Sequence, residues 1–235
     1  FTSFHGKGLF SSSAGDNVKG IFGNFAYEAA RHLFISAGCD LRFYPWLKYR
    51  CSAPSAAVSR EVRIKYLPSE NITTEAVYSY RFSMLNRRES SGIKKQEDII
   101  SRSVKGTLKY SPADNLTFGV RLDYKIAHPG SNRGMLLLQD INYKFRKVPV
   151  SVWIRYCIFK TDSWDSRLYT YENDLLYSFS IPALSGEGNR TYLMVDWRAA
   201  KSIDLRIKYG ITELQKDYNS CIKTEELKFQ ARIWF

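Results

Sequence analysis

Apolar and polar residues alternate regularly along successive short segments of the chain. Between Leu116 and Ile126 every even position is apolar, while the odd positions are Thr, Gly, Arg, Asp and Lys. A period of two residues is typical of a β-strand with one apolar and one polar face. Similar stripes occur at 33–41, 76–82, 148–156 and 203–209. These segments are about 9 to 12 residues long, which is the length a tilted strand needs to cross a bilayer.

The alternation continues to the last residue of the chain. The apolar positions from 227 to 235 include Phe229, Ile233 and Phe235, and the residues between them are mostly Lys, Gln and Arg. A soluble domain rarely ends on an exposed aromatic residue, because chain termini fray into water. We therefore expect this to be the final strand of an outer-membrane β-barrel. We also expect Phe229, Ile233 and Phe235 to form the signal that the barrel assembly machinery recognises during insertion.

The connections between the predicted strands are of two kinds. Short turns rich in Pro, Asn and Asp are expected at 68–71, 112–115, 146–149 and 199–202, with another near 28–31. Longer polar loops are expected at about 43–55, 83–99, 128–134, 160–165, 183–189 and 212–222. In outer-membrane barrels the short turns face the periplasm and the long loops face outside.

Counting strands back from a periplasmic C-terminus gives the orientation and the strand number. The short turns all fall on the periplasmic side if residues 166–182 form two strands joined by a tight turn at Glu172–Asp174. With residues 2–10 as the first strand, the total is about 14, an even number. We therefore predict an all-β fold, an antiparallel transmembrane β-barrel of about 14 strands or the C-terminal part of a larger barrel. Residues 1–235 would form one domain. A soluble sandwich is the alternative, which the regularly charged second face disfavours.

Composition agrees with a bacterial outer-membrane location. The aromatic share is 15%, with 16 Tyr, a residue favoured where membrane meets water. No apolar run is long enough for a transmembrane helix, which requires about 18 residues. The sequence shows no initiator Met and no signal peptide, so we expect a mature form or part of a longer protein. Membrane lipid is then the first partner we expect.

Lys and Arg number 35 against 23 Asp and Glu, a formal charge of +12. Thirteen of the basic residues fall on the polar side of the predicted strands and are expected to face the lumen: Arg63, Lys65, Arg81, Lys105, Lys109, Arg121, Lys125, Arg155, Arg198, Arg206, Lys208, Lys228 and Arg232. Acids on the same side are Asp40, Glu61, Glu75, Asp123, Asp140, Asp196 and Asp204. Charged rings in a lumen select ions of the opposite sign, so one interpretation is an anion-preferring pore. The other is that these charges pair and fill a closed barrel.

Other chemistry has little support in the sequence. The basic residues alternate with apolar ones instead of clustering on one surface, which disfavours nucleic-acid binding. His128, in a loop near Asp123 and Asn132, is the best candidate for a catalytic group, and no Ser is tied to it by spacing. The four Cys have no C-x-x-C spacing, so neither a metal nor another cofactor is expected. Cys51 and Cys221 both fall in external loops, where a disulfide is chemically allowed. We predict that the chain is not an enzyme.

Three stretches resemble a family of Bacteroidetes outer-membrane proteins described as helix-hairpin-helix-domain-containing. They are Gly6-Lys-Gly-Leu-Phe10, Phe43–Arg50 followed by Ser52-Ala-Pro-Ser55, and Tyr171–Pro182. In that family such segments belong to the C-terminal part of a longer protein. The resemblance implies a Gram-negative envelope location and a C-terminal barrel portion, and it transfers no catalytic residue.

Two functional hypotheses follow. The first is a porin-like channel or transporter whose basic lumen favours anionic solutes. The second is a scaffold or accessory subunit of a larger outer-membrane complex. Its docking loop would carry Tyr44, Trp46, Lys48, Tyr49 and Arg50, an aromatic and basic set between two strands.

Overall fold

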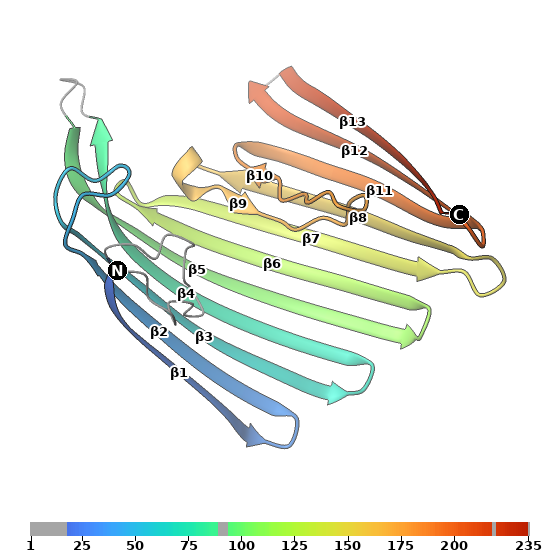
Figure 1. Ribbon diagram of the computed structural model, residues 1–235, viewed down its shortest axis with the longest axis horizontal. Helices are drawn as coiled ribbons and strands as arrows, with labels where there is room; N and C mark the ends of the chain where they lie inside the picture. Colours follow the sequence, from blue (N-terminus) through green and yellow to red (C-terminus); the bar gives the residue numbers. More distant parts are fainter. Residues whose placement is uncertain (1–17, 89–93, 218–219, 235) are drawn as a thin grey trace. The chain divides into compact units, whose positions relative to one another are not determined.

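The computed structural model describes residues 18–88, 94–217 and 220–234, and almost all of them lie in β-strands (Figure 1). No helix in this part of the chain is long and apolar enough to cross a membrane. The long strands are β1 (Lys19–Ala30), β2 (Leu33–Tyr44), β3 (Ser55–Ser69), β4 (Ile72–Arg88), β5 (Lys94–Ala113), β6 (Leu116–His128), β7 (Asn132–Lys144), β8 (Val150–Thr161), β11 (Glu187–Ala200), β12 (Ile203–Asp217) and β13 (Ser220–Ile233). The remaining elements are a 3-10 turn (Trp164–Ser166) and two short strands, β9 (Leu168–Tyr169) and β10 (Ala183–Leu184).

The long strands form one 11-stranded sheet in the order β1-β2-β3-β4-β5-β6-β7-β8-β11-β12-β13. The pairs β1–β2, β2–β3, β7–β8, β8–β11, β11–β12 and β12–β13 are antiparallel in register. The prediction of an all-β antiparallel fold is therefore confirmed. The five predicted short turns are confirmed as well, since each joins two consecutive strands of the sheet.

The described residues contribute 11 strands to the large sheet, and the short strands β9 and β10 form a separate pair. Residues 2–10 lie outside the described residues, and residues 166–182 contribute no strand to the large sheet. Several predicted long loops are wrong, because the strands are longer than the alternation alone suggested. β4 continues to Arg88, β12 continues to Asp217, and β5 begins at Lys94. The predicted orientation is unaffected, because removing two strands between β8 and β11 leaves these neighbours antiparallel.

The chain divides into two compact units. Of the described residues, the first unit contains 18–66, 75–88, 94–104 and 125–132. In it β2 pairs with both β1 and β3, and apolar side chains such as Ile21 and Phe25 are exposed. Its charged side chains form local ion pairs, among them Arg42 with Asp40 and Arg63 with Glu61 and Glu75.

Of the described residues, the second unit contains 67–74, 105–124, 133–217 and 220–234. Its strands have two different faces. The charged face carries Asp140, Arg155, Arg190, Lys208 and Lys228, which the register places on one side of β7, β8, β11, β12 and β13. The apolar face carries Ile141, Ile154, Leu193, Ile207 and Phe229, and all five are exposed.

A covering segment, residues 162–186, leaves the end of β8 and folds over the charged face (Figure 1). It is a narrow hairpin: Leu168 pairs with Leu184, and the backbone N–H of Glu172 donates to the carbonyl of Ser180 at 3.0 Å. Leu168 and Leu184 pack against Leu136, Leu138, Cys157 and Phe159, the buried apolar cluster of this unit.

The predicted tight turn at Glu172–Asp174, with strands on either side, is therefore wrong. The hairpin does turn back in this region, but its tip spans residues 173–179. It lies on the charged face and adds no strand to the large sheet. The physical reason is that both carboxylates of this stretch find cationic partners on β11, β12 and β13. A free turn in water would offer them none.

Candidate functional site

An ion-pair cluster under the covering segment is centred on Glu172. Arg190 on β11 donates through Nε to Oε1 at 2.6 Å and through Nη2 to Oε2 at 2.9 Å, the two-pronged geometry that a guanidinium makes with a carboxylate. Lys208 Nζ on β12 lies 3.0 Å from Oε2. The side chains of Glu172 and Lys208 are both fully buried. The cluster thus joins the segment to two strands.

Asp174 makes a second attachment two residues further on. Its Oδ2 accepts from Lys228 Nζ on β13 at 2.9 Å and lies 3.7 Å from Lys208 Nζ. The Glu226 carboxylate connects the two attachments. Its Oε2 lies 3.2 Å from Arg190 Nη2, and its Oε1 lies 2.8 Å from Lys228 Nζ. Three acids and three bases therefore balance one another in one network. Gln230 adds a hydrogen bond to the backbone N–H of Leu176 at 2.8 Å.

The network lowers the pKa of both carboxyls on the covering segment. For Glu172, burial acts to raise the pKa, but hydrogen bonding from Arg190 and the charges of Arg190 and Lys208 together lower it below its ordinary value of 4.5. For Asp174, burial again opposes the change. Lys228 and the backbone N–H of Leu175 outweigh it and hold the pKa below 3.8. Both groups are therefore ionised at neutral pH.

The base of the covering segment is fixed by close backbone contact. The Arg133 N–H donates to the Asp162 carboxylate at 2.8 Å, and the Thr161 N–H donates to the Gly186 carbonyl at 2.8 Å. Gly134 lies against the carbonyl oxygen of Ser166 so closely that a Cβ at this position would overlap it. Glycine is thus required where the 3-10 turn approaches β7.

Gly134→Ala is expected to loosen the start of the covering segment. Overpacking of this kind costs about 1 to 3 kcal/mol, so backbone amides of residues 162–170 should exchange with deuterium faster than in the parent chain. Gly106→Ala is the matched control, because a Cβ there would meet nothing within 4 Å. Equal exchange in the two variants would contradict the proposed contact.

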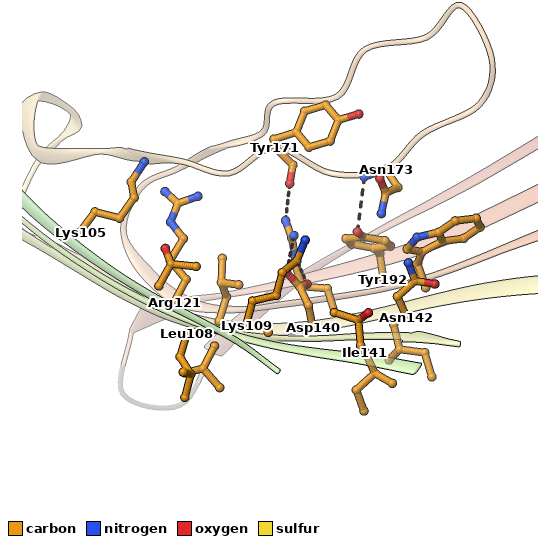
Figure 2. A pocket seen from close by; sticks show the side chains of 18 residues that line it. Lys105, Leu108, Lys109, Arg121, Asp140, Ile141, Asn142, Tyr171, Asn173 and Tyr192 are labelled. Atoms are coloured by element: carbon orange, nitrogen blue, oxygen red, sulfur yellow. Dashed lines mark hydrogen bonds and ion pairs between the residues drawn. The ribbon is translucent and has the colours of Figure 1, made fainter. Parts of the chain in front are cut away.

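A cleft of about 540 Å³ lies between the charged face and the covering segment (Figure 2). Its floor comes from β5, β6, β7, β8 and β11, and its other side includes Tyr171 and Asn173. Lys105 and Arg121 point from the strands to the side where the segment lies, whereas Leu108 and Ile141 point away from it (Figure 2). The volume is in the range of small-molecule sites.

Positive charge predominates along the cleft. Lys105, Lys109, Arg121 and Arg155 line it, against one lining acid, Asp140. Arg155 donates to Asp140 at 2.7 Å and also to the carbonyl of Tyr171. Arg121 pairs with Asp123, outside the lining, and donates to the carbonyl of Tyr169 at 3.1 Å. Each arginine therefore supports the covering segment.

Lys109 differs from the two arginines of the cleft. Across the three described stretches of the chain, no carboxylate lies within ion-pair distance of it. An uncompensated ammonium beside open space attracts anions. It is therefore the cleft residue best placed to meet a solute.

Of the 13 basic residues predicted to face the lumen, nine lie in the second unit. Lys105, Lys109, Arg121 and Arg155 line the cleft, and Lys208 and Lys228 join the ion-pair network. The other three belong to a separate group at the far end of the strands, where Arg206 pairs with Asp196, and Asp204 pairs with both Arg198 and Arg232. Arg63, Lys65, Arg81 and Lys125 lie in the first unit.

The docking-loop candidate lies in the first unit, between β2 and β3. Lys48 Nζ lies 3.7 Å from the centroid of the Tyr44 ring, and the backbones of Lys48 and Cys51 form an isolated β-bridge. The side chains of Trp46 and Tyr49 are 69% and 91% exposed. Arg50 has a φ of 64° and its carbonyl accepts from the backbone N–H of Asn86 at 2.7 Å. The loop is thus held in place while its aromatic rings face solvent.

In the proposed C-terminal signal, Phe229 and Ile233 lie exposed on the apolar face of β13, and Phe235 lies outside the described residues. All four Cys are free, so the disulfide allowed between Cys51 and Cys221 is absent. No group of three or more His, Cys, Asp and Glu side chains could hold a metal ion within 18–88, 94–217 and 220–234. His128 Nδ1 lies 3.4 Å from Ser131 Oγ in the turn between β6 and β7.

Sequence reasoning missed several residues of the site. Arg190 and Tyr192 precede Asp196 and Arg198 in the same alternation of β11, so extending that stripe by three steps, through Met194, finds them. Glu172 and Asp174 are spaced so that both face one side of an extended chain, a signal that was interpreted as a turn. Trp153 and Asn142 occupy opposite positions of β7 and β8, and only the register brings them together.

Comparison of the chain with protein-family models finds no match, and comparison with curated proteins finds none either. The resemblance to helix-hairpin-helix-domain-containing outer-membrane proteins therefore stays a prediction. The assignment of function rests on the geometry of the site alone.

Proposed function

We propose that this chain is an integral protein of a bacterial outer membrane that forms an anion-preferring pore. The pore would be narrowed by residues 162–186. The observation that carries the proposal is the reversal of the two faces in the second unit. The apolar side chains of one face, such as Ile154 and Leu193, are exposed, whereas the opposite face fully buries the charged groups Glu172 and Lys208 beside a small apolar cluster. Water-soluble sheets bury the apolar face. An exposed apolar face suits lipid, and a charged face suits a water-filled lumen.

Aromatic residues at the strand ends support this placement. Tyr110, Phe145 and Trp197 lie on the apolar side of the second unit near its short turns, and each is 44 to 45% exposed. Tyr124 and Tyr156 lie towards the opposite ends and are exposed too. Barrels place such girdles at both membrane surfaces. The strands have 12 to 20 residues, more than the roughly 9 to 11 that a bilayer crossing needs.

Backbone pairing sets a condition on the proposal. β1 and β13 are the first and last strands of the sheet order, and unpaired backbone groups cost several kcal/mol each in hydrocarbon. In the membrane their outer edges must therefore pair with each other or with further strands. The choice between these arrangements does not alter the charged cleft, which lies within the second unit.

Ion selectivity in planar bilayers tests the pore. Under a KCl gradient we expect a reversal potential of the sign that marks anion preference. Lys109→Glu should lower the anion-to-cation permeability ratio roughly fivefold, because a unit charge at close range in water contributes on the order of 1 kcal/mol. Lys147→Glu, in the exposed turn after β7, is the charge-matched control and should change the permeability ratio little.

A scaffold role is the second candidate, and the presentation of Trp46 and Tyr49 by an ordered loop favours it. The two functions separate in the same preparation. A chain that gives no conductance and migrates within a larger complex in mild detergent would favour the scaffold. Conductance without any ion bias would exclude the basic cleft as a selectivity element.

A further inference from the structure

The cleft of the second unit combines three kinds of recognition group that a simple water channel does not need. It has cations at one end, amide and hydroxyl groups along its length, and aromatic rings at the other end. Binding sites for small molecules share this composition, with a few polar groups fixing the orientation of the ligand. A ligand that uses all three kinds carries an anionic group, several hydroxyl groups and a flat face.

The cationic end is formed by Lys105 and Lys109 on β5. They are four residues apart on one strand and so share a face. Ammonium groups are common binders of phosphate and carboxylate, acting as point charges. Neighbouring Thr107 and Thr117 add hydroxyl groups that donate to an anion or to a sugar.

The aromatic end is formed by Trp153 on β8 and Tyr192 on β11. Tyr192 is held on both sides, because Arg155 stacks near its ring at 5.4 Å and its hydroxyl accepts from the backbone N–H of Asn173 at 3.4 Å. Trp153 lies opposite Asn142 in the register of β7 and β8. Tyr192 is only 2% exposed, so Trp153 is the ring that offers a flat surface to a ligand, and the fixed Tyr192 supports it from beneath the segment.

Asn142 adds an unused hydrogen-bonding group. Its side-chain oxygen is buried and, among the residues whose placement is described, it has no hydrogen-bond partner. Leaving a buried polar atom unpaired costs about 1 to 3 kcal/mol. A ligand hydroxyl that donates to this oxygen would recover the loss. The unpaired Asn142 oxygen thus lies beside Trp153 and not at the lysine end of the cleft.

We propose that the cleft binds a small sugar or polyol carrying a phosphate or carboxylate group. The anionic group lies at Lys109, with Lys105 on the same face of β5, and the hydroxylated ring lies on Trp153 beside Asn142. The strands β5 and β8 are three positions apart in the sheet, roughly 14 Å at the usual strand spacing. A lysine side chain and a hexose phosphate together are long enough to span this distance. This proposal rests on the proposed function, since it treats the cleft as a place that solute enters.

Calorimetric titration of the full chain folded in detergent tests the site directly. The probes are glucose 6-phosphate, galacturonate, glucose and inorganic phosphate. We expect the two anionic sugars to bind about tenfold more tightly than glucose or phosphate alone, since one charge-assisted contact is worth about a tenfold change. Comparison of glucose 6-phosphate with galacturonate identifies which anionic group the cleft prefers.

Two variants separate the two ends of the cleft. Lys109→Gln should weaken glucose 6-phosphate about tenfold and leave glucose unchanged, whereas Trp153→Leu should weaken both sugars and leave inorganic phosphate unchanged. Lys147→Gln, outside the cleft, should behave like the parent chain. Circular dichroism and heat-dependent mobility in detergent gels verify that each variant folds.

The outcomes distinguish this proposal from the proposed pore. Equal binding of all four probes, or no binding by a folded chain, overturns the ligand assignment even where bilayers show anion-selective conductance. Selective binding of the anionic sugars supports the assignment even where no conductance is found, and in that case the pore is what fails.

Discussion

Replacing Glu172 with glutamine is expected to release the covering segment from the charged face and to raise the single-channel conductance. Glu172 is the only group through which both Arg190 and Lys208 are tied to the segment in the described structure. Its side chain and that of Lys208 have no exposed surface. Loss of the negative charge leaves the buried Lys208 with only the longer contact to Asp174 at 3.7 Å, and Arg190 with Glu226 at 3.2 Å.

The size of the effect follows from this burial. Removing one partner of a buried ion pair costs about 3 to 5 kcal/mol when the other charge stays uncompensated, and Asp174 and Glu226 offset only part of that cost here. The other contacts that hold the segment are the packing of Leu168 and Leu184, the Asp174–Lys228 pair and hydrogen bonds to its backbone. Segments of this kind open locally without global unfolding. The expected result is an open segment on an intact sheet.

Bilayer recording and hydrogen exchange measure the release together. Glu172→Gln should show a larger conductance step and faster exchange throughout residues 162–186, with unchanged exchange in β11 and β12. Glu187→Gln is the matched control, because the Glu187–Lys160 pair is at least half exposed on both sides and exposed pairs contribute about 1 kcal/mol or less. A Glu172 variant with parental conductance and exchange would refute the role of the cluster.

Most of the long strands could be predicted from the sequence, because the alternation of apolar and polar residues is a local physical signal. Alternation such as that of 116–126 or 203–209 reports two different surroundings on the two sides of a strand, and a sheet provides them locally. The short turns were equally legible because Pro, Asn and Asp fix backbone angles by themselves. Both signals depend on near neighbours in the chain.

The covering segment could not be predicted in this way. Leu168, Thr170 and Glu172 also alternate, so the pattern correctly indicates an extended chain with a buried side. What covers that side is decided by partners on β7, β8, β11 and β12, far away in sequence. Alternation cannot tell a strand added to the sheet from a hairpin lying on it.

The candidate site was found only in part for the same reason. Arg121, Arg155, Lys208 and Lys228 were placed on one face by their position within each strand. Their partners required the register between strands and the path of the segment. The strand pattern predicted that the polar face is positively charged. The cleft and its aromatic end depend on contacts between segments that are far apart in the sequence.

Acidification is expected to open the covering segment, and the direction follows from the pKa values of its two carboxyls. Both Glu172 and Asp174 have pKa values below their ordinary 4.5 and 3.8 when the segment is closed. The released segment therefore binds protons more readily than the closed one. Closure is fully stabilised above the ordinary values, and the stabilisation is lost as the pH falls through the lower, closed-state values.

Conductance recorded as the pH is lowered from about 7 to about 3 should thus rise below pH ~4, with a steeper rise than one carboxyl would give, since two groups release together. The double variant Glu172→Gln with Asp174→Asn should already be open at neutral pH and show no further rise. The variant removes both titrating groups and leaves Glu226, Asp140 and the exposed acids in place. If it kept the full pH response, the acid-sensitive element would lie elsewhere on the charged face, and closure would not depend on the Arg190, Lys208 and Lys228 contacts to this segment.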